Sequence, residues 1–121
     1  MLKKLFIFFM FLITSPVFAG ELEDAMKAHP KTFLYLFSSK CGYCVKFDAQ
    51  YAKLNKKYEN CKFVKIDINS KYGTLLRRDF NAYYVPYVAL IDSRNSTIQV
   101  VEPNCLIDNA CLNKEMNKFL K

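Results

Sequence analysis

The chain has 121 residues, a formal net charge of +7, five Cys, no Trp and three Gly. This length allows one domain, and an apolar fraction of 52%, with 16% aromatic residues, excludes a disordered chain. The sequence holds a single long apolar run, which excludes a bundle of membrane-spanning helices. The lysines are scattered and form no Arg-rich stretch, so the charge predicts a solvated basic surface and no nucleic-acid partner.

Residues 1–19 have the layout of a secretory signal peptide. Two lysines precede the apolar run Leu5–Ile13, and a small-x-small triplet ends at Ala19. In a helix that run spans only about 14 Å, well short of the ~30 Å hydrocarbon core, which disfavours a retained membrane anchor. We therefore expect cleavage near Ala19 and a periplasmic or otherwise exported domain over residues 20–121. Disulfides persist in such a compartment.

Hydrophobic periodicity then alternates between helix and strand. Residues 32–38 are a continuous apolar run, typical of a strand buried on both faces. Ser38 and Ser39 are candidate caps of a following helix, in which Phe47, Tyr51, Leu54 and Tyr58 recur at helical spacing. In chain order we predict helix 21–28, strand 32–38, helix 41–59, strand 62–68, helix 71–80, strand 85–91, strand 97–101 and helix 108–120.

The order of these elements predicts the fold class. A strand, a helix and a second strand within about forty residues form a βαβ unit with parallel strands. The short polar turn 92–96 requires the two later strands to be antiparallel. The sequence thus predicts an α/β domain with a four-stranded mixed sheet flanked by helices, in the order α-β-α-β-α-β-β-α.

The motif Cys41-Gly42-Tyr43-Cys44 lies where the first strand meets the long helix. A helix N-terminus carries unpaired N–H groups and a partial positive charge, and both stabilise a thiolate. The positive charges of Lys40 and Lys46, close by in the sequence, also stabilise a thiolate. Because the thiolate is the form that attacks a disulfide, we predict that Cys41 is the nucleophile. Cys44, one turn further along, resolves the mixed disulfide.

Two other interpretations of this pair remain open. A structural zinc site needs four ligands, but the sequence has no second CxxC and only one histidine, His29, so no metal is predicted. An inert structural disulfide would close a very short loop and stabilise the fold little.

Three segments resemble thioredoxin-fold oxidoreductases of the exported, Dsb-like kind. They are FLYLFSSKCGYC, KFVKIDI and YYVPYVAL, and the resemblance covers about residues 32–121. It implies a thiol–disulfide oxidoreductase that acts on protein or peptide thiols and disulfides and needs no prosthetic group. It also implies a separate redox partner that recycles the cysteine pair.

The resemblance also implies a substrate site. Pro86 should be cis and face the CxxC pair, and the backbone of Val85 should pair with an extended substrate segment. Tyr43, Tyr84 and Tyr87 are candidates for an aromatic rim around the thiols, and for Tyr87 ordinary strand packing is an equal alternative.

The sequence departs from the family in two respects. Cytosolic thioredoxins usually carry a buried acid six residues before the first Cys, whereas this chain has Tyr35 there, so the proton of Cys44 needs another acceptor. The CGYC tetrapeptide matches periplasmic disulfide isomerases, but those need a dimerisation domain for which this chain has no room. We therefore expect a monomer.

The remaining three cysteines divide by topology. Cys105 should lie near the active-site end and Cys111 in the first turn of the last helix, close enough for a structural disulfide. Cys61 should lie at the opposite end and stay unpaired within the chain, either buried as a small hydrophobe or free for intermolecular pairing.

A rival from another functional class is a thioredoxin-fold module that binds extended peptides or a metal ion without turnover.

Overall fold

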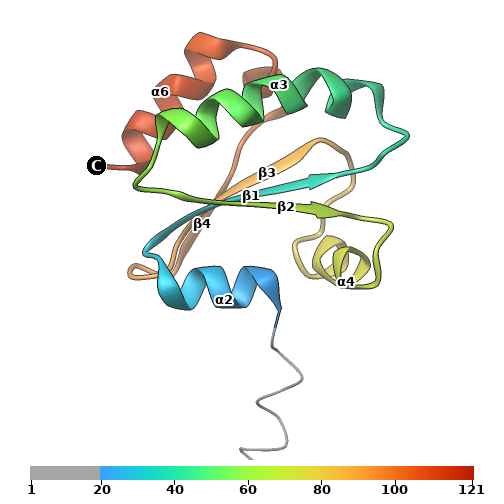
Figure 1. Ribbon diagram of the computed structural model, residues 1–121, viewed down its shortest axis with the longest axis horizontal. Coiled ribbons are helices and arrows are strands. Elements are labelled where there is room, and N and C mark those ends of the chain that lie inside the picture. The colour runs from blue at the N-terminus through green and yellow to red at the C-terminus, as the bar shows by residue number, and fades with distance from the viewer. Residues whose placement is uncertain (1–19) are drawn as a thin grey trace, which may run out of the picture.

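A four-stranded mixed sheet forms the centre of the computed structural model, which describes residues 20–121 (Figure 1). The signal peptide expected over residues 1–19 lies outside the described residues. The elements are α2 (Glu21–Ala28), β1 (Lys31–Phe37), α3 (Gly42–Lys57), β2 (Lys62–Asp67), α4 (Lys71–Asp79), β3 (Tyr87–Asp92), β4 (Thr97–Val100), α5 (Pro103–Leu106) and α6 (Asn109–Phe119). Within these residues, no helix is long and apolar enough to cross a membrane.

The sheet has the order β2-β1-β3-β4. Strand β1 pairs in parallel with β2 and antiparallel with β3, and β3 pairs antiparallel with β4. Helices α3 and α6 cover one face, while α2 and α4 cover the other (Figure 1). The predicted α/β class and mixed four-stranded sheet are confirmed.

The central strand β1 is buried on both faces because it lies between two helical layers. Phe33 and Tyr35 belong to the core under α3 and α6, whereas Leu34 and Leu36 belong to the core over α2 and α4. All four side chains are 0% exposed, and burial of each contributes about 2 kcal/mol. This buried strand ends at Phe37, four residues before Cys41, so it positions the CxxC segment.

Two local features differ from the sequence-based prediction. Strand β3 begins at Tyr87 and not at Val85, because Pro86 has no backbone N–H to donate to a sheet. Residues Pro103–Leu106 form the short helix α5, which was not predicted. Proline is favoured in the first turn of a helix, and α5 begins on Pro103.

Helix α4 packs closely on the end of β2. Gly73 lies against the backbone of Asp67, and a Cβ at this position would overlap the Asp67 carbonyl oxygen. The helix is capped by the Ser70 hydroxyl, which accepts a hydrogen bond from the Gly73 N–H at 2.9 Å. Only glycine permits this approach, so the contact places α4 at the same end of the sheet as the cysteine pair.

Candidate active site

Cys41 and Cys44 form a disulfide at the start of α3, with Cα atoms 5.2 Å apart. The chain leaves β1 at Phe37, turns over the four residues 38–41 and enters α3 at Gly42. Cys44 is 1% exposed, whereas Cys41 is partly exposed. The accessible sulfur is therefore the one at the helix entrance.

Cys41 is itself the N-cap of α3. Its Sγ accepts a hydrogen bond from the Cys44 N–H at 3.1 Å, and no acidic residue lies in the first helical turn. Ser38, predicted as a cap, instead accepts a hydrogen bond from the Lys40 N–H at 3.3 Å. The helix begins one turn too late for either serine to cap it. A sulfur that caps a helix is stabilised as a thiolate by the helix N–H groups.

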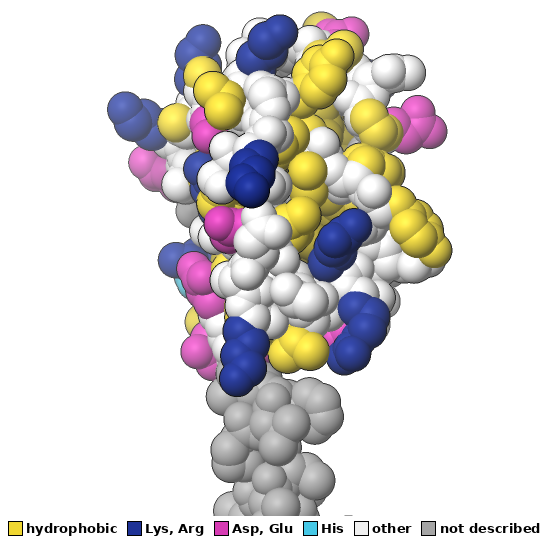
Figure 2. Space-filling model, turned by 90° about the vertical axis from the view of Figure 1, so that its right-hand side faces the viewer, with side chains coloured by type: hydrophobic (Ala, Val, Ile, Leu, Met, Phe, Trp, Pro, Cys, Tyr) yellow, Lys and Arg dark blue, Asp and Glu magenta, His cyan; other side chains and the backbone are white. Residues whose placement is uncertain are grey.

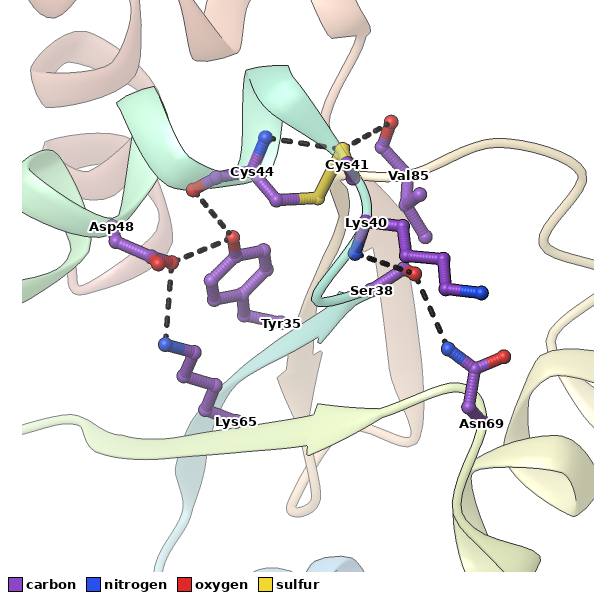
Figure 3. Close-up of a disulfide and its surroundings, with 9 residues drawn as sticks. All are labelled: Tyr35, Ser38, Lys40, Cys41, Cys44, Asp48, Lys65, Asn69 and Val85. Carbon is purple, nitrogen blue, oxygen red and sulfur yellow. Dashed lines mark hydrogen bonds and ion pairs between the residues drawn. A yellow bond between two sulfur atoms is a disulfide. The ribbon is translucent and has the colours of Figure 1, made fainter.

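The segment before β3 faces this sulfur. The Val85–Pro86 peptide bond is cis, and the carbonyl oxygen of Val85 lies 3.6 Å from Cys41 Sγ (Figure 3). The backbone of Val85 is thus next to the reactive atom, and a chain segment bound there would reach Cys41.

A groove of about 520 Å³ opens beside Val85. It brings together Tyr43, Tyr84, Val85 and Pro86, which the sequence analysis assigned to substrate binding. Helix α3 forms one wall and the region of α5 forms the other. Its lining residues are Tyr43, Lys46, Phe47, Gln50, Tyr84, Val85, Pro86, Pro103, Asn104, Leu106, Ile107 and Asn109.

The aromatic rim is smaller than the sequence suggested. Tyr43 is 66% exposed and Tyr84 is 39% exposed, so both are accessible from the groove. Tyr87 is buried and packs against Phe80 and Tyr84, so its side chain belongs to the core. Hydrophobic side chains gather on this end of the molecule, with Lys and Arg side chains among and around them (Figure 2).

A polar network lies behind Cys44. The Tyr35 hydroxyl lies 3.1 Å from the Cys44 carbonyl oxygen and 2.9 Å from Asp48 Oδ1. Lys65 Nζ of β2 lies 3.2 Å from the same Asp48 oxygen. Burial and the hydrogen bond to Asp48 raise the pKa of Tyr35 well above its usual range, so the hydroxyl keeps its proton at neutral pH.

The remaining cysteines occupy two further places. Cys105 of α5 and Cys111 of α6 form a disulfide, with Cα atoms 5.2 Å apart. Cys61 is unpaired and 7% exposed, just before β2 at the end of α3 remote from the CxxC pair. Burial raises the pKa of the Cys61 thiol to about 12, so this thiol stays protonated and unreactive at neutral pH.

Sequence reasoning missed two parts of this region. The α5 wall of the groove was not predicted, although Pro103, six residues before α6 begins, was a usable signal for a helix start. Asp48 was also missed. It stands four residues after Cys44, a spacing that places two side chains on the same face of a helix.

The fold and the site together define a thioredoxin-fold protein whose CxxC disulfide lies at the start of α3, the first helix after β1. The sequence model of the Thioredoxin family matches residues 13–116, so this chain belongs to the thioredoxin family. A comparison with curated proteins found no match. The family fold with a CxxC pair supports thiol–disulfide oxidoreductase chemistry.

Solved thioredoxins have the same fold. The short form of thioredoxin F from spinach chloroplast is 21% identical with a TM-score of 0.69, over 82% of this chain and 85% of that chain. Oxidised thioredoxin from Plasmodium falciparum is 16% identical with a TM-score of 0.68, over 82% and 89%. Thioredoxin O1 from Arabidopsis thaliana is 20% identical with a TM-score of 0.68, over 84% and 91%.

Proposed function

We propose that this protein is an exported, Dsb-like thiol–disulfide oxidoreductase that exchanges disulfides with protein substrates through Cys41 and Cys44. One observation carries the proposal: the partly exposed Cys41 sulfur caps α3, accepts the Cys44 N–H and lies 3.6 Å from the Val85 carbonyl beside an open groove. An inert staple needs neither an accessible sulfur nor a groove beside it.

The reaction has two exchange steps. The Cys41 thiolate attacks a substrate disulfide, so a Cys41–substrate S–S bond forms and the other substrate sulfur leaves as a thiolate. Cys44 then attacks Cys41 Sγ, which forms the Cys41–Cys44 disulfide and releases the second substrate thiolate. Two electrons pass from protein to substrate, and the reverse sequence oxidises a substrate dithiol.

The substrate segment lies in the groove in an extended conformation. Backbone pairing with Val85 gives affinity without requiring a particular sequence, while Tyr43 and Tyr84 supply apolar contacts. Such a site suits many protein substrates.

Export accounts for the N-terminal sequence, and we propose cleavage near Ala19 and action as a monomer outside the cytoplasm. The intact mass of the protein recovered from the exported fraction tests the cleavage site. A separate redox protein recycles the cysteine pair. The reduction potential measured against glutathione assigns the direction, since about −120 mV marks an oxidant and about −270 mV a reductant.

Trapping of the intermediate tests the chemistry. The reduced Cys44→Ser variant, mixed with a disulfide-containing protein such as insulin, should accumulate a mixed disulfide through Cys41, seen on non-reducing gels and by mass spectrometry. Cys41→Ser should trap little and lose turnover by about 100-fold or more. Cys61→Ser, which removes a buried thiol elsewhere, should turn over as the wild type does. A Cys41→Ser protein with full turnover would refute the proposal.

A further inference from the structure

Two strongly exposed apolar side chains lie on the two walls of the groove beside Val85. Tyr43, in the first turn of α3, is 66% exposed, and Ile107, the C-cap of α5, is 75% exposed. Both line the groove. Large apolar side chains that gather at one exposed place mark a binding surface. The substrate contacts proposed above use Tyr43 and leave Ile107 without a role.

The fold does not need the side chain of Ile107. Its neighbour Leu106 is 2% exposed and belongs to the core under α3 and α6, so Leu106 is the residue that anchors α5. The side chain of Ile107 points away from that core and keeps most of its surface in water. A substitution of Ile107 should therefore alter what the groove binds and leave the fold intact.

The backbone on both sides of Ile107 is held in place. The Cys105–Cys111 disulfide closes the segment that contains it. The Asp108 N–H donates to the Cys105 carbonyl oxygen at 3.2 Å, and the Asp108 carboxylate accepts the Cys111 N–H at 3.2 Å. A contact on a pre-organised backbone costs little entropy when a ligand covers it. Ile107 is thus an exposed apolar side chain in a fixed position.

The groove also restricts the charge of what enters it. Of the twelve described residues that line it, only Lys46 is charged, and none is acidic. The Lys46 ammonium lies 5.7 Å from the centroid of the Tyr43 ring, beside the apolar wall. A basic side chain in the groove would meet a like charge and find no carboxylate among these residues, and such a repulsive contact selects against a ligand.

We propose that Ile107 and Tyr43 select substrates whose reacting cysteine has a large apolar side chain, and no basic one, within about three residues. This inference rests on the proposed function. Cys41 Sγ lies 3.6 Å from the Val85 carbonyl oxygen, and Val85 lines the groove. A chain joined to Cys41 therefore enters the groove next to its own cysteine. Since an extended chain advances about 3.3 Å per residue, its next side chains reach the space between the two walls.

Short peptides of Gly and Ser with a single cysteine test this selection. The cysteine is linked by a disulfide to thionitrobenzoate, and Leu, Ser or Lys stands at one of the positions near it, before or after. The full chain is reduced only at Cys41–Cys44, as checked by intact mass. The Cys41 thiolate attacks the peptide sulfur, so a Cys41–peptide S–S bond forms and thionitrobenzoate leaves as a coloured thiolate with the bonding electrons. Its absorbance gives the rate, which is divided by the rate of mercaptoethanol with the same peptide.

The ratio of the Leu rate to the Ser rate is the readout, because changes in Cys41 reactivity or in the amount of folded protein cancel in it. At the best position this ratio should be about fivefold or more for the wild type. Ile107→Ser should reduce it to about twofold or less, whereas Ile107→Val should keep most of it. The matched control Ile98→Ser removes an exposed isoleucine from β4, outside the groove, and should keep the wild-type ratio.

The Lys peptides test the selection by charge. With Lys at the best position the wild type should react more slowly than with Ser, and Lys46→Met should reduce this difference by about threefold at low salt.

Three results would overturn the proposal. They are equal wild-type rates with Leu and Ser at every position, an unchanged Leu-to-Ser ratio in Ile107→Ser, and a wild-type preference for Lys over Ser. A wild type that releases thionitrobenzoate no faster than Cys41→Ser from every peptide would instead refute the proposed function itself.

Discussion

At the scale of single residues, Thr32 in β1 carries an unused polar group. Its side chain is 0% exposed, and its hydroxyl finds no hydrogen-bond partner among residues 20–121. A buried hydroxyl without a partner costs about 1–3 kcal/mol. Thr32→Val keeps the branched shape and removes the hydroxyl, so it should raise the free energy of unfolding by about 1 kcal/mol, measured by urea denaturation.

The matched variant Thr32→Ser keeps the hydroxyl and removes the methyl group. It should lower the free energy of unfolding by about 1 kcal/mol. A loss of stability in Thr32→Val as well would mean that the hydroxyl is satisfied in solution, for instance by a buried water.

Among the secondary-structure elements, α5 and α6 are held together by the Cys105–Cys111 disulfide. A crosslink that closes so short a loop stabilises a fold by about 2 kcal/mol, because it lowers the conformational entropy of the unfolded chain. Replacing both cysteines by Ala should lower the free energy of unfolding by about this amount. Because residues of α5 line the groove, the variant should bind protein substrates more weakly, while Cys41 attacks glutathione disulfide at the wild-type rate.

Urea denaturation and the insulin and glutathione assays measure these three effects. Cys61→Ala serves as the control for loss of a buried sulfur outside the disulfide. A double variant that attacks glutathione disulfide much more slowly would show that this disulfide takes part in the exchange chemistry and is not merely a staple.

The turn between β3 and β4 depends on Asp92. Its carboxylate accepts hydrogen bonds from the Arg94 and Asn95 N–H groups, both at 3.1 Å, and forms an ion pair with Lys31 at 2.7 Å. The hydrogen bond from Lys31, followed by those from Asn95, holds the pKa of Asp92 well below its usual range. Since the unfolded pKa is about 3.9, this contribution to stability is complete above about pH 4 and lost as the pH falls further.

Asp92→Asn should therefore lower the thermal unfolding midpoint at pH 6, and the difference from the wild type should shrink below pH 4. Circular dichroism melts over pH 2–7 measure both effects. The exposed Asp79→Asn, whose carboxylate lies 3.9 Å from Arg78, should show little change at any pH. A deficit for Asp92→Asn that persists undiminished at pH 2 would contradict the linkage.

For the whole molecule, the fold could be predicted because its signals are local. The apolar run of β1 and the helical spacing of Phe47, Leu54 and Tyr58 follow from the burial that each element needs, and the structure buries these side chains. The helices differ from the prediction by a residue or two, since helix ends depend on caps such as Cys41, where a sulfur replaces the expected serine.

The candidate site could be predicted in part. The CxxC pair was recognisable because its spacing is local, whereas Val85 was assigned only through the resemblance of the segment around Pro86 to thioredoxin-fold oxidoreductases. The groove wall at α5 and the Tyr35–Asp48–Lys65 network bring together residues from separate elements, and a single sequence does not give such distances. Tyr87 shows the same limit, because only its packing against Phe80 decides that it is buried.

The charge of the whole protein, formally +7, should favour anionic substrates. Lys46 lines the groove and stands over the Tyr43 ring, 5.7 Å from its centroid, and a basic surface raises the encounter rate of anions. Each rate of attack by Cys41 on a small disulfide is first divided by the rate at which mercaptoethanol attacks the same disulfide, which removes differences in intrinsic reactivity. At low salt this normalised rate should be at least about threefold higher for glutathione disulfide, which is anionic, than for cationic cystamine.

The ratio of the two normalised rates, glutathione disulfide over cystamine, should approach one in 1 M salt, where the Debye length is only about 3 Å. Stopped-flow rates for both disulfides, at low and at high salt, measure it. Lys46→Met should reduce the preference at low salt more than Lys53→Met, which removes the same charge further along α3 and away from the groove. Equal effects of the two variants would mean that net charge alone steers the substrate, whereas a larger effect of Lys46→Met places the steering at the groove beside Cys41.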